Sequence, residues 1–353
     1  MFKKKEYQKK TQMCFFGCYL VLIVLLLIVM LFSFYVGRFS GIEFFDAPKI
    51  LLSKIFPWIH QTWTDTAEAV IMNLRLPRII TAVIVGASLA VSGALYQSLF
   101  SNPVASSDTL GVSASAAFGA VLGILLNISE IGIKMISFVV GCIAVFVVFM
   151  FSSKISKGRN LTVYLILIGM VVSSLFQAFL SLLKYMADPE DQLPKITYWL
   201  MGSFSNVALE DIPYCIGCFV IGIVPIFLLR WRFNFLSVSD YEAKSMGENI
   251  NLLRLITVVC ATLLTSSAVA TTGGISWIGL VIPHITRMVV GNDTRHLIPT
   301  SALMGGLFLL IVDNLARSLT VYELPISVLT SLIGAPIFFI ILIKNKEKIV
   351  HGN

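Results

Sequence analysis

The sequence has little charge for its length. Of its 353 residues only 13% are Asp, Glu, Lys or Arg, whereas 57% are hydrophobic and the mean hydropathy is +0.89. A soluble domain carries about 25% charged residues, so a chain this apolar is predicted to fold in a bilayer. The net charge of +7 lies in short clusters between apolar runs. Because it forms no basic patch interleaved with aromatic residues, nucleic-acid binding is not expected.

Signatures of catalysis are missing as well. The sequence contains no H-E-x-x-H, no G-x-S-x-G and no Walker A motif, so it does not itself cradle the phosphates of ATP. Cys215 and Cys218 form a C-x-x-C pair without further Cys or His ligands nearby, and we interpret them as small apolar helix residues. We therefore expect no metal site, no cofactor and no enzymatic activity. A membrane-embedded enzyme would need a polar cluster that the sequence does not show.

Charge-free runs of membrane-spanning length recur along the chain. About 20 mostly apolar residues cross a bilayer as a helix, and eight windows qualify: 11–37, 79–102, 109–129, 135–153, 161–183, 212–229, 296–312 and 324–343. A ninth window, 255–286, contains Gly273 and Gly274. Adjacent glycines break a helix, so we predict two spans that meet at 271–275. Small residues crowd 86–94 and 111–120, which favours close helix packing.

The fold class that follows is all-α: a single polytopic membrane domain, 1–353, with about ten transmembrane helices. An even number of spans puts both termini on one side. With the N-terminus inside, the inner segments hold 17 of the 26 Lys and Arg residues, as the positive-inside bias requires. We therefore place the basic tail 1–10, segment 230–254 and both termini in the cytoplasm. The aromatic-rich loop 38–78 is expected at the outer interface.

One inner segment has the residues of a short helix. Ser237 or Ser239 can cap it, Asp240 and Glu242 then lie in its first turn, and Gly247 can end it. A capped amphipathic helix at the cytoplasmic surface suits docking to a soluble partner. An ordinary solvated connector fits these residues equally well.

Four basic or ionisable residues lie at span ends. Arg75, Arg78 and Arg317 are at predicted outer ends, against the usual charge bias. They either grip an acidic partner outside or anchor to lipid phosphates. His284 follows Pro283 inside a span, and an intramembrane ionisable residue is a functional candidate by default. Its place near the inner end favours a structural hydrogen bond.

These segments give the chain a resemblance to the permeases of iron-siderophore and vitamin B12 ABC importers. The resemblance runs in order from about residue 74 to the C-terminus. It is carried by Leu-Arg-Leu-Pro-Arg at 74–78, Asn-Pro-Val-Ala at 102–105, Leu-Gly-Val-Ser at 110–113, Tyr-Trp-Leu-Met-Gly-Ser at 198–203, Gly-Ile-Ser-Trp-Ile-Gly-Leu-Val-Ile-Pro-His at 274–284, Leu-Ile-Pro at 297–299, Asp-Asn-Leu-Ala-Arg at 313–317, Glu-Leu-Pro at 323–325 and Gly-Ala-Pro at 334–336. The structural residues of this motif set are Asn102, Pro103, Gly279, Pro283, His284, Arg287, Gly334 and Pro336.

The resemblance implies a type II ABC importer permease in the plasma (inner) membrane of a prokaryote. Two permease subunits, identical or homologous, would form the pathway, with ATP-binding subunits inside and an extracytoplasmic substrate-binding protein outside. It assigns the inner helix to ATPase coupling and the three outer arginines to binding-protein docking. It also makes His284 a shared structural feature. The coupling residues would be Asp240, Glu242, Ala243, Met246 and Gly247.

The resemblance leaves the cargo open. Relatives carry ferric siderophores, haem, cobalamin or oxyanions, and a ferric siderophore is the first expectation. Asn314 departs from the family pattern, where alanine, isoleucine or leucine is commoner.

Two other kinds of function stay as alternatives. An ion-coupled secondary transporter is disfavoured because no row of charged residues lies at mid-membrane depth, and a structural or signalling subunit would move nothing.

Overall fold

A computed structural model describes residues 2–37, 39, 41–43, 45–156 and 160–344. In this part of the chain the secondary structure is helical throughout, without strands. Seven helical spans are long and apolar enough to cross a bilayer: Phe15–Ser33, Asp65–Leu99, Glu130–Ser156, Leu161–Met186, Asp211–Leu229, Ile250–Thr272 and Thr294–Ser318. Three shorter apolar helices are Val112–Leu125, Ile278–Val290 and Ile326–Ile341. Together these helices correspond one to one to the ten predicted spans, which confirms the all-α membrane fold.

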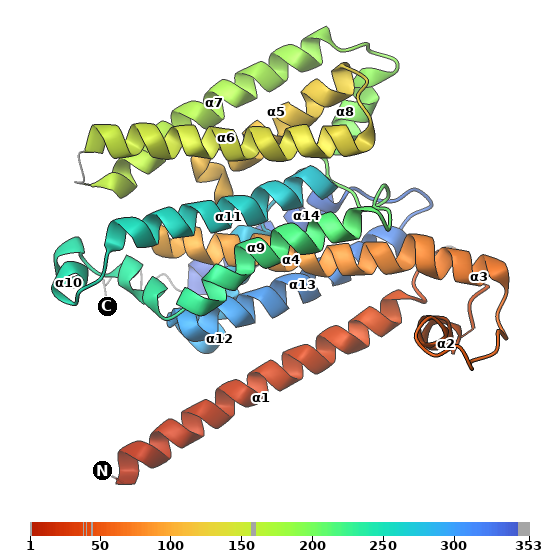
Figure 1. Ribbon diagram of the computed structural model, residues 1–353, viewed down its shortest axis with the longest axis horizontal. Helices are drawn as coiled ribbons and strands as arrows, with labels where there is room; N and C mark the ends of the chain where they lie inside the picture. The colour runs from red at the N-terminus through yellow and green to blue at the C-terminus, as the bar shows by residue number, and fades with distance from the viewer. Residues whose placement is uncertain (1, 38, 40, 44, 157–159, 345–353) are drawn as a thin grey trace.

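The long helices form two groups in Figure 1. Helices α5, α6 and α7 pack on one another, and α11 joins them to a second group around α4. Helix α1 runs obliquely along the outside and contacts α13. The bounds are α1 Phe2–Ser33, α4 Leu76–Leu99, α5 Val112–Leu125, α6 Glu130–Ser156, α7 Leu161–Met186, α9 Asp211–Leu229, α11 Ile250–Thr272, α12 Ile278–Val290, α13 Thr294–Ser318 and α14 Ile326–Lys344.

Helix α4 lies at the centre of its group, because glycines let its neighbours approach backbone to backbone. A Cβ atom on Gly86 would lie 2.3 Å from the carbonyl oxygen of Gly305 in α13. A Cβ atom on Gly93 would lie 1.9 Å from the carbonyl oxygen of Gly279 in α12. Such contacts replace the hydrophobic drive that lipid removes. The predicted close packing of the small-residue spans is therefore present.

The break predicted at 271–275 is also present. Helix α11 ends at Thr272 and α12 begins at Ile278. Gly273 has a φ of +76°, and a Cβ atom there would lie 2.1 Å from the carbonyl oxygen of Trp199. Glycine is required at this position for two reasons. A side chain disfavours a positive φ, and the carbonyl oxygen of Trp199 leaves no space for a Cβ atom.

The connection after α1, which the sequence predicts to lie outside, is more structured than a loop. It contains α2 (Asp46–Ser53), α3 (Asp65–Ala69) and a π-helical turn, Val70–Arg75, that leads into α4. Trp58 is exposed, whereas Trp63 is buried and its Nε1 donates to Glu68 Oε2 at 2.8 Å. Residues 38, 40 and 44 of this loop lie outside the described residues, as do 345–353 at the C-terminus. The basic tail continues α1 as helix from Phe2.

Candidate functional site

The predicted inner helix is α10, Asp240–Ser245. Ser239 is its N-cap: the Ser239 side chain accepts from the Glu242 backbone N–H at 3.3 Å, and the Glu242 carboxylate accepts from the Ser239 backbone N–H at 3.1 Å. This reciprocal pair is a capping box. At the other end, Gly247 has a φ of +81°, and the Glu248 N–H donates to the Ala243 carbonyl at 3.0 Å. A left-handed glycine with that bond ends a helix, so both predicted boundaries are confirmed.

Helix α10 is held to the bundle by ion pairs at both ends. Asp240 pairs with Arg254 of α11 at 2.6 Å, and Glu248 pairs with Arg232 at 2.8 Å. Between them Ala243 is fully buried against the core. A six-residue helix is too short to be stable alone, so these contacts fix its orientation. The pairing with Arg254 could not be predicted from the sequence, because a basic residue 14 positions away has no local relation to Asp240.

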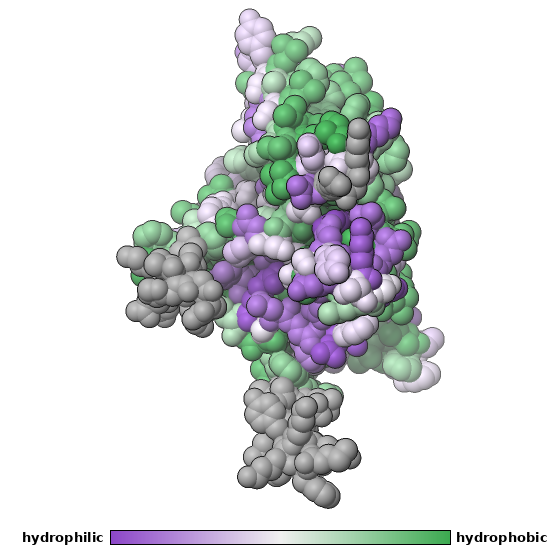
Figure 2. Space-filling view, turned by 90° about the vertical axis from the view of Figure 1, so that its left-hand side faces the viewer, coloured by the Kyte–Doolittle hydropathy of each residue, from purple (hydrophilic) through white to green (hydrophobic). Residues whose placement is uncertain are grey.

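The remaining face of α10 is open. Tyr241 is 84% exposed and Met246 is 64% exposed. Figure 2, which faces the end of the bundle that carries α10, shows hydrophilic side chains gathered at its centre and apolar surface beside them. Tyr241 on α10 and Met246 at its C-cap are therefore two large exposed side chains beside a polar end face.

Asp293 stabilises the same end of the bundle. It caps α13, and it accepts from Asn234 Nδ2 at 3.0 Å and from Arg295 Nη2 at 2.6 Å. Partial burial alone would raise the pKa of Asp293. The hydrogen bonds from Arg295 and Asn234 outweigh burial and lower it to about 2. The carboxylate therefore stays ionised and ties the connection around Asn234 to the start of α13.

The three predicted outer arginines come together at the opposite end of the helices, but each is buried. Arg78, in the first turn of α4, binds the fully buried Asp313 of α13 at 2.8 Å and Glu323 at 2.9 Å. These partners are 235 and 245 residues away in sequence. Asp313 accepts from Nε and is paired with Nη2 of Arg78, the two-nitrogen arrangement that makes guanidinium–carboxylate binding strong, whereas both Glu323 oxygens accept from Nη1 alone.

Arg317 links α13 to the end of α1. Its guanidinium donates to the carbonyl oxygens of Ser33 at 3.2 Å and Val36 at 3.1 Å, and to Asn314 Oδ1. Asn314 Nδ2 in turn donates to Ser33 Oγ at 2.7 Å. The family departure noted at Asn314 therefore has a structural role here, because its amide ties α1 to Arg317.

Arg75 has no carboxylate partner among the described residues. It donates to the carbonyl oxygens of Phe34 and Phe39. A cavity of ≈380 Å³ lies between the three guanidinium groups and is also lined by Glu323. Three cations face two carboxylates, Asp313 and Glu323, so the cluster keeps one excess positive charge. Such a cavity suits one further carboxylate.

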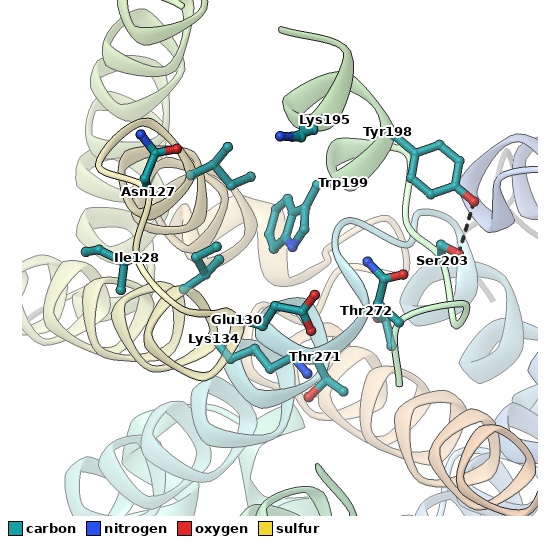
Figure 3. A pocket seen from close by; sticks show the side chains of 13 residues that line it. Asn127, Ile128, Glu130, Lys134, Lys195, Tyr198, Trp199, Ser203, Thr271 and Thr272 are labelled. Atoms are coloured by element: carbon teal, nitrogen blue, oxygen red, sulfur yellow. Dashed lines mark hydrogen bonds between the residues drawn. The ribbon is translucent and has the colours of Figure 1, made fainter. Parts of the chain in front are cut away.

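A second cavity, of ≈480 Å³, opens between the α5–α6 turn, α8 (Gln192–Leu200) and the end of α11. Figure 3 shows Trp199, Lys195, Glu130 and Thr271 around it. Lys134 is paired with Asp211 at 2.6 Å, and Lys195 is paired with Asp191 at 2.7 Å. An anionic cargo would therefore meet polar and aromatic groups here, but no unpaired lysine among the residues that line the cavity.

The remaining motif residues pack helices rather than line these cavities. Arg287 of α12 donates to the Ala94 carbonyl at 3.3 Å and to Gln97 Oε1 at 3.4 Å in α4. Gln97 Nε2 donates to the Leu280 carbonyl at 3.2 Å. With the Gly279 contact to α4, these bonds fix α12 on α4. Gly334 of α14 lies against Trp277 in the same way, since a Cβ atom there would lie 2.8 Å from the Trp277 Cβ.

The other motif residues mark turns and helix interiors. Asn102 Oδ1 accepts from the Val104 N–H at 2.9 Å across Pro103, which closes the turn after α4. Pro283 and Pro336 lie inside α12 and α14. The hydrogen bond expected for His284 is not found: Nδ1 has no partner in the described part of the chain, and the ring packs edge-on against Phe338 at 6.0 Å.

The cysteine pair shows no ligand set. Cys215 is buried with its Sγ 3.4 Å from Thr271 Oγ1, and Cys218 is a free thiol on the same helix. No group of three or more His, Cys, Asp or Glu residues that could hold a metal occurs among the described residues.

Comparison with known proteins extends over most of the chain. The chain is 40% identical to the molybdate import system permease protein MolB of Haemophilus influenzae, over 92% of this chain and 95% of the relative. It is 34% identical to a probable iron chelatin transport system permease protein of Helicobacter pylori, over 93% and 97%. Further relatives are named as cobalamin and hemin permeases.

The architecture agrees with a solved structure. An inward-facing metal-chelate type ABC transporter superposes with a TM-score of 0.82 at 38% identity, over 92% of this chain and 98% of that one. The family model of the FecCD transport family matches residues 20–344. The chain is therefore a multi-pass membrane permease that belongs to the FecCD transport family.

Proposed function

We propose that this chain is the membrane-spanning subunit of an ATP-driven importer and that α10 transmits the work of separate ATPase subunits. The observation that carries the proposal is the exposure of Tyr241 on α10 and of Met246 at its C-cap, on a helix fixed to α11 by the Asp240–Arg254 pair. Asp240, Glu242, Ala243 and Gly247 hold that helix in position, and Tyr241 and Met246 contact the ATPase. Both termini and segment 230–254 then lie in the cytoplasm. No covalent chemistry occurs in this chain.

The outer arginine cavity is the proposed dock for a substrate-binding protein. Burial of Arg75, Arg78 and Arg317 means that the partner must insert a side chain rather than touch a flat surface. Glu323 is the part of the cluster open to solvent, with its side chain 29% exposed. A carboxylate of the binding protein would approach beside Glu323 and use the excess positive charge. Docking would therefore weaken at high salt.

The cargo we propose is a metal chelate, with a ferric siderophore first. The metal-chelate type neighbour in structure and the iron chelatin relatives support this choice. The pathway would form between two permease subunits, either two copies of this chain or this chain and a homologue. Its walls need bind the cargo only weakly, because the binding protein supplies the selectivity.

A second candidate cargo is an oxyanion of the molybdate class. The relative named as a molybdate permease is more similar to this chain, at 40% identity, than the iron chelatin relatives at 34%. The cavity of ≈480 Å³ between the α5–α6 turn and α8 does not favour one of these cargoes over the other. Its two lysines are already paired with carboxylates and offer no free charge to an anion.

The test is uptake by proteoliposomes that contain the permease, its ATPase and its binding protein. A panel of labelled ferric siderophores, haem, cobalamin and molybdate is offered with and without ATP. Accumulation of a ferric siderophore that needs ATP supports the proposal. ATP-dependent accumulation of molybdate alone would replace the chelate with the oxyanion. Uptake that follows a proton or sodium gradient without the ATPase would overturn the importer.

A further inference from the structure

A continuous groove runs between α6 and α11 on a side of the bundle where apolar side chains such as Phe146 and Val259 are exposed. It consists of a cavity of ≈460 Å³ near the helix ends beside α10 and a second cavity of ≈250 Å³ farther along the two helices. Phe149 of α6 and Leu255 of α11 line both cavities. The two are therefore neighbouring parts of one groove.

The groove exists because α6 and α11 touch at one level and then separate. At Gly141 a Cβ atom would lie 2.7 Å from Ser266 Oγ, so the two helices are in contact there. Cys142 is the next residue of α6 and already lines the deeper cavity. Figure 1 shows α6 and α11 diverging from this region toward the end that carries α10. The contact at Gly141 thus closes one end of the groove, and the divergence of α6 and α11 beyond it opens the rest.

The lining of the groove changes character along its length. The cavity beside α10 is lined by hydroxyl and amide side chains in addition to apolar ones, namely Ser153, Ser156, Asn249 and Asn251. The deeper cavity is almost entirely apolar and is lined by Cys142, Val145, Phe146, Phe149, Leu255, Val258, Val259, Thr262 and Leu263. A polar mouth at the helix ends beside α10 followed by an apolar channel matches a molecule with a polar head and a hydrocarbon tail.

The physical alternatives for the deeper cavity are water, emptiness or hydrocarbon. Water needs two to four polar partners, and the lining provides the Thr262 hydroxyl, which is already bonded to Tyr96 at 3.2 Å. An empty cavity forfeits dispersion contacts on all its walls. Val259 and Phe146 are exposed beside it, so the cavity opens to the bilayer and hydrocarbon can enter.

We infer that the α6–α11 groove is a binding site for a glycerophospholipid of the inner leaflet. One acyl chain lies in the apolar cavity between Phe149 and Leu263. The glycerol and phosphate oxygens lie in the polar mouth, where the side chains of Asn251, Ser153 and Asn249 donate hydrogen bonds. Asn249 also caps α11 by accepting from the Leu252 N–H at 3.1 Å, which leaves its amide N–H groups available.

The site adjoins the segment that holds α10. Asn249 and Asn251 begin α11 only a few residues after Gly247, and Arg254 on the same helix binds Asp240. A lipid in the mouth therefore packs against the first turn of the helix that positions α10. The choice of the inner leaflet rests on the proposed cytoplasmic position of segment 230–254, whereas lipid binding in the groove does not depend on import and is measured without transport.

The test uses phosphatidylglycerol with a photoactivatable diazirine in its acyl chain, reconstituted with the full-length protein. Peptide mass spectrometry should find labels concentrated in 142–149 and 255–263. Val259→Phe, which fills the groove, should lower that labelling about tenfold, the affinity change for about two buried methylene groups. Ile143→Phe is the matched control, because Ile143 is an exposed aliphatic residue of α6 outside the groove lining. It should leave labelling unchanged.

A second variant tests the polar mouth independently of packing. Asn251→Leu removes a donor at an exposed position and should reduce the phospholipid retained by the purified protein in native mass spectrometry. Diazirine labels spread evenly over all lipid-facing helices would overturn the site. So would labelling of 142–149 that persists at full strength in Val259→Phe while the variant folds with wild-type stability.

Discussion

Truncation of Tyr241 separates docking by α10 from the stability of the fold. The Tyr241 side chain is 84% exposed and makes no hydrogen bond within the described chain. Its removal should change the free energy of unfolding by less than about 0.5 kcal/mol, as for other surface positions. Asp240→Lys is a less clean probe, because it also breaks the 2.6 Å pair with Arg254.

The cost to ATPase binding can be worked from the exposed surface. A tyrosine buries roughly 150–200 Å², and at about 25 cal/mol per Å² full burial contributes at most about 4–5 kcal/mol. Ordering the side chain and incomplete desolvation reduce this value. Central interface tyrosines lose about 2 kcal/mol on truncation. Tyr241→Ala should therefore weaken ATPase binding about 30-fold.

The assay is a titration of the detergent-solubilised permease with its labelled ATPase subunit. Tyr322→Ala is the matched control, because Tyr322 is 85% exposed but lies in the outer turn between α13 and α14. The reasoning is refuted if Tyr241→Ala binds the ATPase with wild-type affinity. It is refuted equally if the two tyrosine variants lose the same affinity, because the effect would then not be local to α10.

Arg75→Glu should weaken binding-protein association about tenfold or more and slow uptake, because it removes the one cation of the cluster that has no carboxylate partner among the described residues. Normal association of this variant would refute docking at the arginine cavity. Glu323→Gln should instead tighten association, most clearly at low salt. Alanine at both Cys215 and Cys218 should leave uptake within about twofold, and a large loss would reopen a metal or redox role for that pair. The pKa of Asp293 is held at about 2, below about 3.8 in the unfolded chain. The ionised Asp293 carboxylate therefore contributes to stability above about pH 4, and this contribution is lost as the pH falls through about 2. The difference in Tm between wild type and Asp293→Asn should accordingly stay constant from about pH 8 to pH 5.

The sequence predicts those parts of the fold that depend on local composition. Hydropathy locates the ten spans because a bilayer imposes helix length and apolarity on each one separately. The glycines at 273–274 predict the break between α11 and α12, and Ser239 and Gly247 predict the ends of α10. Each of these signals lies within a few residues of the feature it specifies.

Contacts between distant segments could not be predicted in that way. Burial of the outer arginines depends on Asp313 and Glu323, which the fold brings to Arg78 from more than 200 residues away. From the sequence alone, positive charge at a predicted outer helix end fits an exposed docking residue as well as it fits a buried ion pair. The anchoring of α10 by Arg254 and the role of Asn314 in binding α1 follow only from the packed helices.

For His284 the sequence suggested a contact that the fold does not contain. Position near a helix end favoured a polar partner, but the ring packs against Phe338 of α14 instead. The neighbouring helix supplies an aromatic face at that point, and sequence periodicity does not reveal which helix faces which.

The central claim is that this permease imports its cargo with energy from separate ATPase subunits. The most direct measurement is cargo accumulation in proteoliposomes under three conditions: ATP with the ATPase present, ATP with the ATPase omitted, and an imposed proton or sodium gradient alone. The account predicts accumulation in the first condition only, and its loss in a permease whose α10 carries Tyr241→Ala. Accumulation in the third condition without any ATPase would contradict it.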